Sequence, residues 1–189
     1  MSRVVVLDAC VLYPAALRDL LVRLAVAGGF RALWSERILD EAFVSLAEDR
    51  PGLDPVRLLR TRALMTGAIP EAMIRLTEAE LPVATLPDAD DRHVVVAAQL
   101  GMANAIVTFN LRDFPDSALA PLGLKAVHPD DFALDCFVRT PNVVRRVLHG
   151  QAAQLTRPVS TVNQLLDHLE RAGLVKFAAA CRSGDHPGA

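Results

Sequence analysis

The fold class of this chain follows from one segment, Pro87-Asp88-Ala89-Asp90-Asp91-Arg92-His93-Val94-Val95-Val96-Ala97-Ala98. Three carboxylates within four residues precede an apolar run that we expect to be helical. The dipole and the unpaired N–H groups of a helix start favour negative charge, so one aspartate there needs no functional explanation. We expect Asp88 to be the N-cap of this helix, with Asp90 and Asp91 in its first turn.

A second acidic residue, Asp8, directly follows an apolar run near the N-terminus. Residues 3–7 read Arg-Val-Val-Val-Leu, the pattern of a strand that is buried on both faces of a parallel sheet. A helix is expected to follow, beginning at Pro14 and ending at Gly28. In open α/β sheets, ligands bind at the carboxyl ends of the strands, which is where we expect Asp8 to lie.

Strand and helix signals alternate along the following residues. We expect helices to begin at Ser35, at Asp54-Pro55 and at Pro70, and strands to span residues 82–86, 104–108 and 124–127. This alternation predicts an α/β fold with a central parallel sheet flanked by helices, over residues 1–138. Strand signals then stop, and residues 139–189 predict a C-terminal extension made of helices.

Composition limits the possible functions. The 189 residues are 52% hydrophobic and 22% charged, so the chain has ample material for a buried core. A net charge of −2 provides no broad attraction to nucleic acid, so any such binding must come from local basic residues or bound cations. The three cysteines form no ligand or disulfide pattern, and no uncharged stretch is long enough to cross a bilayer. We therefore expect a cytoplasmic protein without membrane contacts.

Carboxylates that are far apart in the sequence are expected to converge at one edge of the sheet. Asp8 ends the first strand, Asp90 begins the helix after the strand at residues 82–86, and Asp113 follows the strand at residues 104–108. Glu41, on the helix that begins at Ser35, could lean over the same edge. Such carboxylates repel one another and raise one another's pKa, and a hard cation such as Mg²⁺ resolves this conflict. The bound ion can activate water and neutralise charge on a phosphodiester.

With these motifs, the chain resembles the PIN-domain ribonucleases, in particular the VapC-like toxins of type II toxin–antitoxin modules. Four segments in the appropriate order carry the resemblance, which covers roughly residues 1–135: residues 5–12 (VVLDACVL), 35–41 (SERILDE), 88–93 (DADDRH) and 106–114 (IVTFNLRDF). Residues 140–144 and 157–162 are similar to the helical extension of a VapC-like subgroup.

The resemblance implies an Mg²⁺- or Mn²⁺-dependent endoribonuclease, a hydrolase of RNA phosphodiester bonds. Its four catalytic acids are Asp8, Glu41, Asp90 and Asp113, and the metal ligands are Asp8, Asp90 and Asp113. The resemblance further implies an RNA substrate, an antitoxin that blocks the site, and a homodimer. Thr108 would orient a carboxylate or water through its hydroxyl group.

Several assignments stay open. Asp88 and Asp91 are rivals to Asp90 for the third acid, and family members often carry an acid where this chain has Asn110, which can ligate or position water. Arg37 and Arg112 are candidates for phosphate contacts because they lie near the site motifs.

Two further residues and the activity itself also have alternatives. His93 reads as a general base or as a packed histidine, and Trp34 as a core residue or as a base-stacking platform. The alternative to a ribonuclease is a noncatalytic PIN-like RNA-binding module. A nucleotide-binding domain is disfavoured, because no phosphate-binding glycine loop follows any strand.

Overall fold

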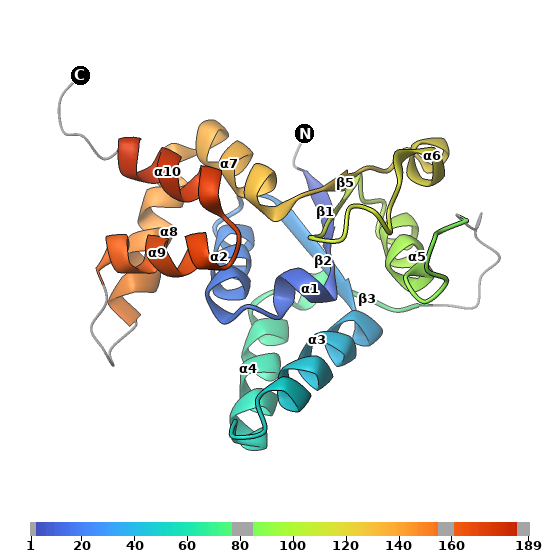
Figure 1. Ribbon diagram of the computed structural model, residues 1–189, viewed down its shortest axis with the longest axis horizontal. Helices are drawn as coiled ribbons and strands as arrows, with labels where there is room; N and C mark the ends of the chain where they lie inside the picture. Colours follow the sequence, from blue (N-terminus) through green and yellow to red (C-terminus); the bar gives the residue numbers. More distant parts are fainter. Residues whose placement is uncertain (1–2, 77–84, 155–160, 185–189) are drawn as a thin grey trace.

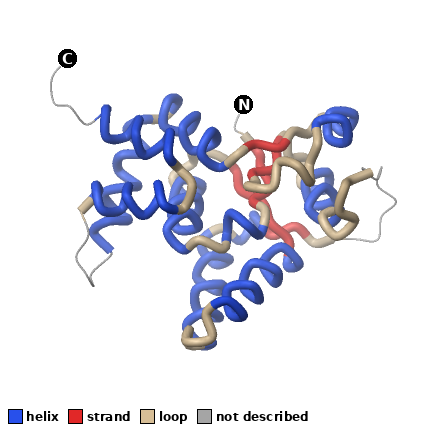
Figure 2. The backbone as a smooth tube through the Cα atoms, viewed as in Figure 1, coloured by secondary structure: helices blue, strands red, loops and turns tan. Residues whose placement is uncertain are grey.

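The computed structural model describes residues 3–76, 85–154 and 161–184. Within these ranges, short strands lie at the centre of the molecule and helices surround them (Figures 1 and 2). The predicted fold class, α/β with a central parallel sheet and C-terminal helices, is confirmed.

The described sheet has five parallel strands in the order β3-β2-β1-β4-β5. The strands are β1 (Val4–Leu7), β2 (Arg31–Ser35), β3 (Met73–Ile74), β4 (Ala105–Val107) and β5 (Ala126–Val127). The central strand β1 pairs with β2 on one side and β4 on the other, and Val5, Val6 and Leu7 are fully buried. Burial on both faces explains the continuous apolar run of this strand.

The helices of the described ranges connect and cover these strands, and they are shown in Figure 1. They are α1 (Ala9–Leu12), α2 (Ala15–Val26), α3 (Glu36–Asp49), α4 (Pro55–Ala68), η1 (Pro70–Ala72), α5 (Arg92–Leu100), α6 (Asp116–Leu119), η2 (Ala120–Leu122), α7 (Pro129–Arg139), α8 (Pro141–Gln154), α9 (Val162–Arg171) and α10 (Val175–Gly184). The chain moves outward from β1 to β2 and β3, and then crosses back to β4 and β5. The point at which strand order reverses is therefore between the neighbours β1 and β4, where open α/β sheets bind ligands.

Local capping signals were predicted well. The Ser35 side chain accepts a hydrogen bond from Ile38 N at the start of α3, and Asp54 accepts one from Val56 N at the start of α4. Both contacts satisfy N–H groups that a helix leaves unpaired in its first turn.

Two predictions about helix starts were wrong. The helix expected from Pro70 ends after the 3-10 turn η1, because Met73 and Ile74 pair with β2 as the edge strand β3. Helix α5 begins at Arg92, later than expected, so its N-cap is Asp91 instead of Asp88. The Asp88 carboxylate instead accepts from Asp90 N at 2.9 Å in the preceding turn.

The strand expected at residues 82–86 lies mostly outside the described residues. Residues 82–84 are not described, and Thr85 and Leu86 are not in a strand.

Helices α7–α10 gather beside α2, away from α5 and α6 (Figure 1). The carboxylate of Asp130, which is 4% exposed, joins the first and last of them by accepting from Lys176 N at 2.9 Å and Phe177 N at 2.8 Å. It thereby satisfies N–H groups at the start of α10. One hydrophobic core includes residues on both sides of residue 138, so the division into 1–138 and 139–189 stays a prediction.

No helix in the described ranges has the length and apolar character needed to span a bilayer.

Candidate active site

Asp8 lies directly after β1, at the carboxyl edge of the sheet, and only 5% of it is exposed. Its Oδ2 accepts a hydrogen bond from Thr108 Oγ1 at 2.7 Å, and its Oδ1 accepts one from Ala9 N at 2.7 Å. The Cys10 thiol donates to Oδ2 at 3.2 Å. These donors hold the carboxylate in one orientation and leave it acceptor capacity.

The residues after β4 complete this arrangement. Thr108 is fully buried, and its hydroxyl accepts from Asn110 N at 2.9 Å while it donates to Asp8. Phe109 N donates to Cys10 Sγ at 3.3 Å, which ties the same loop to α1. The two strands at the reversal point therefore place Asp8 and Asn110 next to each other.

A cavity of about 430 Å³ opens at this point, between α1 and α3. Its walls include Asp8, Glu41, Asp91 and Asn110. Asp90 is exposed and does not line this cavity, and its backbone oxygen accepts from Arg37 Nη2 at 3.3 Å. Of the rival aspartates at residues 88–91, the structure thus brings Asp91 to Asp8 and Glu41.

The carboxylates around the cavity affect one another electrostatically. Burial and then the charges of Asp8, Asp113, Asp88 and Glu41 raise the pKa of Asp91 from 3.8 to about 6. Burial also raises the pKa of Glu41, with Asp8 and Asp90 contributing, although Arg37 opposes this shift. Asp113 is half-buried and does not line the cavity, yet its charge acts on Asp91. Negative charge therefore gathers at this edge of the sheet, and Arg37 neutralises it in part through its ion pair with Glu41.

His93 holds Glu41 from the neighbouring helix. Its Nε2 lies 2.9 Å from Glu41 Oε1, and Arg37 Nε donates to the same oxygen at 3.2 Å. Burial, and then the charge of Arg37, lowers the pKa of His93 to about 4, so the ring is neutral at pH 7.

His93 is only 7% exposed, and its buried Nδ1 has no hydrogen-bond partner within the described residues. It is a packed histidine, but one whose contact with Glu41 sequence reasoning missed. No pattern in one sequence links residues 41 and 93.

The sequence profile of the PIN domain matches residues 4–112, which is more than half of the chain. The chain belongs to the PIN domain family. A second profile, described as the VapC50 C-terminal domain, matches residues 129–183 of this PIN-domain protein, the region that contains helices α7–α10. The resemblance to VapC-like PIN proteins is confirmed.

One curated relative is a Mycobacterium tuberculosis protein named "Putative ribonuclease VapC50". It is 42% identical to this PIN-domain chain over 92 residues, which cover 49% of this chain and 54% of the relative. The chain thus matches about half the length of that relative. No solved structure matches this PIN-domain chain significantly.

The donor chemistry of the PIN-domain site fits a hard divalent cation. The cavity walls present carboxylate oxygens and the side-chain amide oxygen of Asn110, which are ligands that Mg²⁺ accepts. Across the described ranges, no three Asp, Glu, His or Cys side chains come close enough together to hold one ion. The mutual repulsion at Asp91 shows that a cation would relieve an existing conflict.

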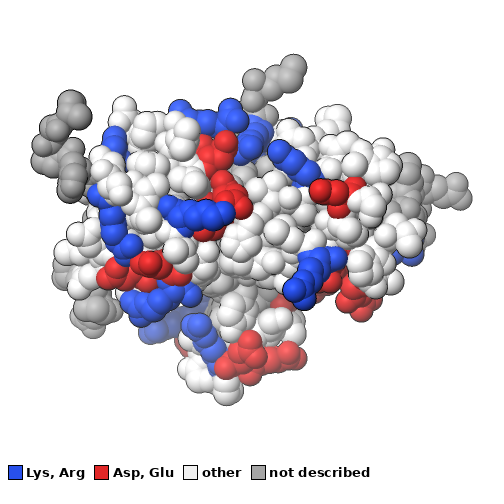
Figure 3. Space-filling view, turned by 45° about the horizontal axis from the view of Figure 1, so that its top comes forward, with Lys and Arg blue, Asp and Glu red and all other residues white. Residues whose placement is uncertain are grey.

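The two arginines expected to contact RNA lie at different sides of the site. Arg37 is on α3, half-exposed, and holds Glu41 as well as the turn at Asp90. Arg112 is exposed in the loop after β4. On the face shown in Figure 3, basic and acidic side chains form small interspersed groups, in keeping with the net charge of −2.

The C-terminal helices reach this same loop through the turn between α9 and α10. Gly173 has a φ of +97°, and a Cβ there would lie 3.0 Å from Phe109 Cε1. The Phe109 ring also meets the His128 ring edge to face, with centroids 5.2 Å apart. Glycine is needed at residue 173 for both the backbone conformation and the close approach.

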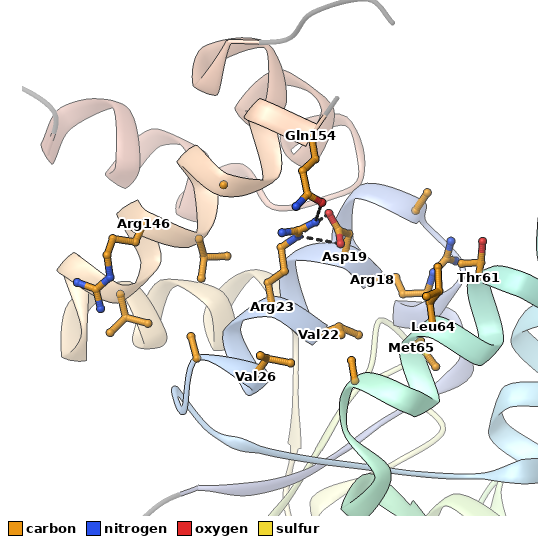
Figure 4. Close-up of a pocket in the computed structure, with 16 residues that line it drawn as sticks. Arg18, Asp19, Val22, Arg23, Val26, Thr61, Leu64, Met65, Arg146 and Gln154 are labelled. Atoms are coloured by element: carbon orange, nitrogen blue, oxygen red, sulfur yellow. Dashed lines mark hydrogen bonds and ion pairs between the residues drawn. The ribbon is translucent and has the colours of Figure 1, made fainter. Parts of the chain in front are cut away.

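A larger cavity, of about 720 Å³, lies between α2, α4 and α8. Its walls are mainly apolar, and Arg23 pairs there with Asp19 and Gln154 (Figure 4). None of the acids that line the smaller cavity lines this larger one. The smaller, acidic cavity is therefore the candidate active site. Trp34 is fully buried in the core, and so it is not a base-stacking platform.

Proposed function

We propose that this PIN-domain protein is a metal-dependent endoribonuclease, the toxin of a VapBC-type toxin–antitoxin system. The observation that carries the proposal is the convergence of Asp8, Glu41 and Asp91 on one cavity at the carboxyl edge, where neighbouring charges help to raise the pKa of Asp91 to about 6. The name of the Mycobacterium tuberculosis relative, a ribonuclease, supports the same activity.

Each acid has a proposed role. Asp8 and Asp91, which both line the cavity, would hold the ion, and Glu41 and Asp113 complete the acidic set. We favour Asp91 over Asp90 as the third acid because only Asp91 lines the cavity. When bound, Mg²⁺ or Mn²⁺ supplies an activated water and neutralises charge on the phosphate.

The surrounding residues keep the acids in place. Thr108 orients Asp8, and Asn110, next to it, can position a ligand or water through its amide. Glu41 is oriented by the neutral ring of His93 and by Arg37. Such orientation matters because catalytic groups act only when they are held close to the productive geometry.

The partners that we propose are an RNA substrate, a cognate antitoxin and a second copy of the chain, in the cytoplasm. Arg37 and Arg112 are the proposed phosphate contacts at the site. A homodimer would help a chain of net charge −2 to hold RNA through paired local patches. Light scattering that shows only monomers at working concentration would contradict the dimer.

A second candidate function is a noncatalytic PIN-like module that binds RNA without cleaving it. Two observations favour it: Asn110 stands where family members often carry an acid, and the described residues contain no three Asp, Glu, His or Cys side chains close enough together to hold one ion. The two candidates differ in turnover, which can be measured directly.

The deciding experiment is RNA cleavage by the purified chain with Mg²⁺ or Mn²⁺, with and without EDTA. We expect cleavage that requires the ion and that Asp8→Asn abolishes while the variant still melts cooperatively. Cleavage that survives complete chelation would contradict the metal mechanism. Metal-independent RNA binding without any cleavage would favour the noncatalytic module.

A further inference from the structure

The acidic cavity extends beyond the acids. Its far end, between α1 and α3, is lined by Tyr13, Ser45 and Asp49. None of these three residues has a role in the reaction proposed above. They line the same cavity as Asp8 and Glu41, so a ligand long enough to span the cavity can contact both groups of residues.

The spacing of the α3 residues along this cavity suits one nucleotide. Glu41, Ser45 and Asp49 are separated by four residues each, and such residues share a helix face. With a rise of about 1.5 Å per residue, Ser45 lies roughly 6 Å and Asp49 roughly 12 Å along the helix from Glu41. A nucleotide whose phosphate is held at the acids would place its base over this end of the cavity.

Tyr13 offers a ring that is already fixed in place. Its hydroxyl donates to Asp49 Oδ2 at 3.0 Å, and the Arg50 guanidinium lies 5.9 Å from its ring centroid. Both partners are at the end of α3, so the ring is tied to the opposite wall of the cavity. A base that stacks on an aromatic side chain gains about 1–3 kcal/mol, and a fixed ring loses little freedom on binding.

The polar groups around the ring suit a base edge and disfavour a phosphate. Asp49 brings a negative charge, which repels phosphate oxygens but accepts hydrogen bonds from N–H groups. The Ser45 hydroxyl adds a second acceptor on the same helix face. Guanine, adenine and cytosine each present an exocyclic amino group to such acceptors, whereas uracil offers only its N3–H, between two carbonyl oxygens that the Asp49 carboxylate repels.

We propose that Tyr13, Ser45 and Asp49 form a nucleobase subsite that selects an amino-bearing base in the nucleotide next to the scissile phosphate. The base stacks on Tyr13, and its amino group donates to Asp49. This inference rests on the proposed ribonuclease function and specifies which part of the RNA the site distinguishes.

The test is to sequence the cleavage products of a random single-stranded RNA pool, in Mg²⁺ or Mn²⁺, for the full chain and its variants. The wild type should disfavour uracil at one position beside the cut. Asp49→Asn should weaken this preference, because an amide both accepts and donates and can also pair with uracil carbonyl groups. Tyr13→Ala should raise KM by roughly 5- to 150-fold, the equivalent of the stacking energy, and change kcat less.

Two conservative comparisons separate recognition from folding. Tyr13→Phe keeps the ring and should retain most of the affinity, and Glu48→Gln removes an exposed charge beside Asp49 that does not line the cavity. The cleavage profile of Glu48→Gln should equal that of the wild type. Equilibrium binding of short labelled RNAs in EDTA, measured by fluorescence anisotropy without turnover, should rank the wild type and its variants in the same order as their KM values.

The outcomes distinguish the two levels of the proposal. A wild type that cleaves no RNA with either ion overturns the ribonuclease function, and the subsite with it. A wild type that cleaves with a base preference that Asp49→Asn and Tyr13→Ala leave unchanged overturns the subsite alone. A lower melting temperature in these variants with an unchanged preference shows that the Tyr13–Asp49 contact only joins α1 to α3.

Discussion

Replacing Asp91 with asparagine should stabilise the metal-free protein at neutral pH. Asp91 is half-buried and faces the charges of Asp8, Asp113, Asp88 and Glu41, so its ionised form is less favourable in the folded state than in the unfolded chain. Asparagine keeps nearly the same size and removes the charge. The side chain makes no capping hydrogen bond at the start of α5, so little is lost there.

The size of the effect follows from the pKa of Asp91, which rises from 3.8 to about 6 on folding. Each unit of pKa shift corresponds to about 1.36 kcal/mol of unfolding free energy. Because solvent screens the charge of a half-exposed carboxylate, we reduce the resulting destabilisation by about half, to about 1–1.5 kcal/mol. For a chain of this length, this free energy corresponds to an increase in Tm of roughly 2–6 °C.

The pH dependence has a definite sign. The folded pKa is raised, so the destabilisation is fully present above about pH 6 and disappears as the pH falls toward 3.8. The advantage of Asp91→Asn over the wild type should therefore be largest at pH 7.5 and roughly halved at pH 5. Added Mg²⁺ should stabilise the wild type more than the variant, because the ion neutralises the same charges.

The assay is thermal unfolding in EDTA at pH 7.5 and pH 5, repeated with excess Mg²⁺. Asp90→Asn is the matched control, since Asp90 is a neighbouring aspartate that is exposed and does not line the cavity. Equal Tm values for wild type and Asp91→Asn at pH 7.5, or a Tm increase in Asp90→Asn instead, would refute the placement of Asp91 among the acids.

Two further predictions concern buried polar contacts. His93→Leu removes the ring nitrogen that lies 2.9 Å from Glu41 Oε1 and should lower kcat of RNA cleavage about tenfold with little change in KM, whereas His93→Gln should retain most of the activity. Equal kcat values would contradict the orienting role. Asp130→Ala leaves two N–H groups of α10 unpaired and should cost about 2–4 kcal/mol in urea unfolding. Asp131→Ala, which breaks an exposed ion pair with Lys176, should change the stability much less. Similar losses for the two aspartates would show that the Asp130 contacts are not structural.

Much of the fold was predictable because its signals are local. The apolar run that ends at Asp8, the N-cap at Ser35 and the proline that begins α4 each act within a few residues. Parallel strands buried on both faces have a recognisable composition, and their carboxyl ends must share one edge. For this reason Asp8 and the loop after β4 could be assigned to one site from the sequence.

The edge strand β3 could not be identified in this way. Met73 and Ile74 form a strand of two residues whose only regular partner among the described residues is β2. A short apolar pair after a proline is equally compatible with a helix, and only the tertiary pairing decides between them.

The sequence alone therefore accounts for the parallel sheet, the helical C-terminal region and the placement of Asp8 and Glu41 at one edge. Only the tertiary structure decided that Asp91, rather than Asp90, faces the cavity, and that His93 holds Glu41. Adjacent aspartates point in directions set by where α5 begins, and this start depends on how the helix packs against β1, β2 and β4. Local propensity determines the elements, whereas the contacts between residues far apart in the chain are determined by packing.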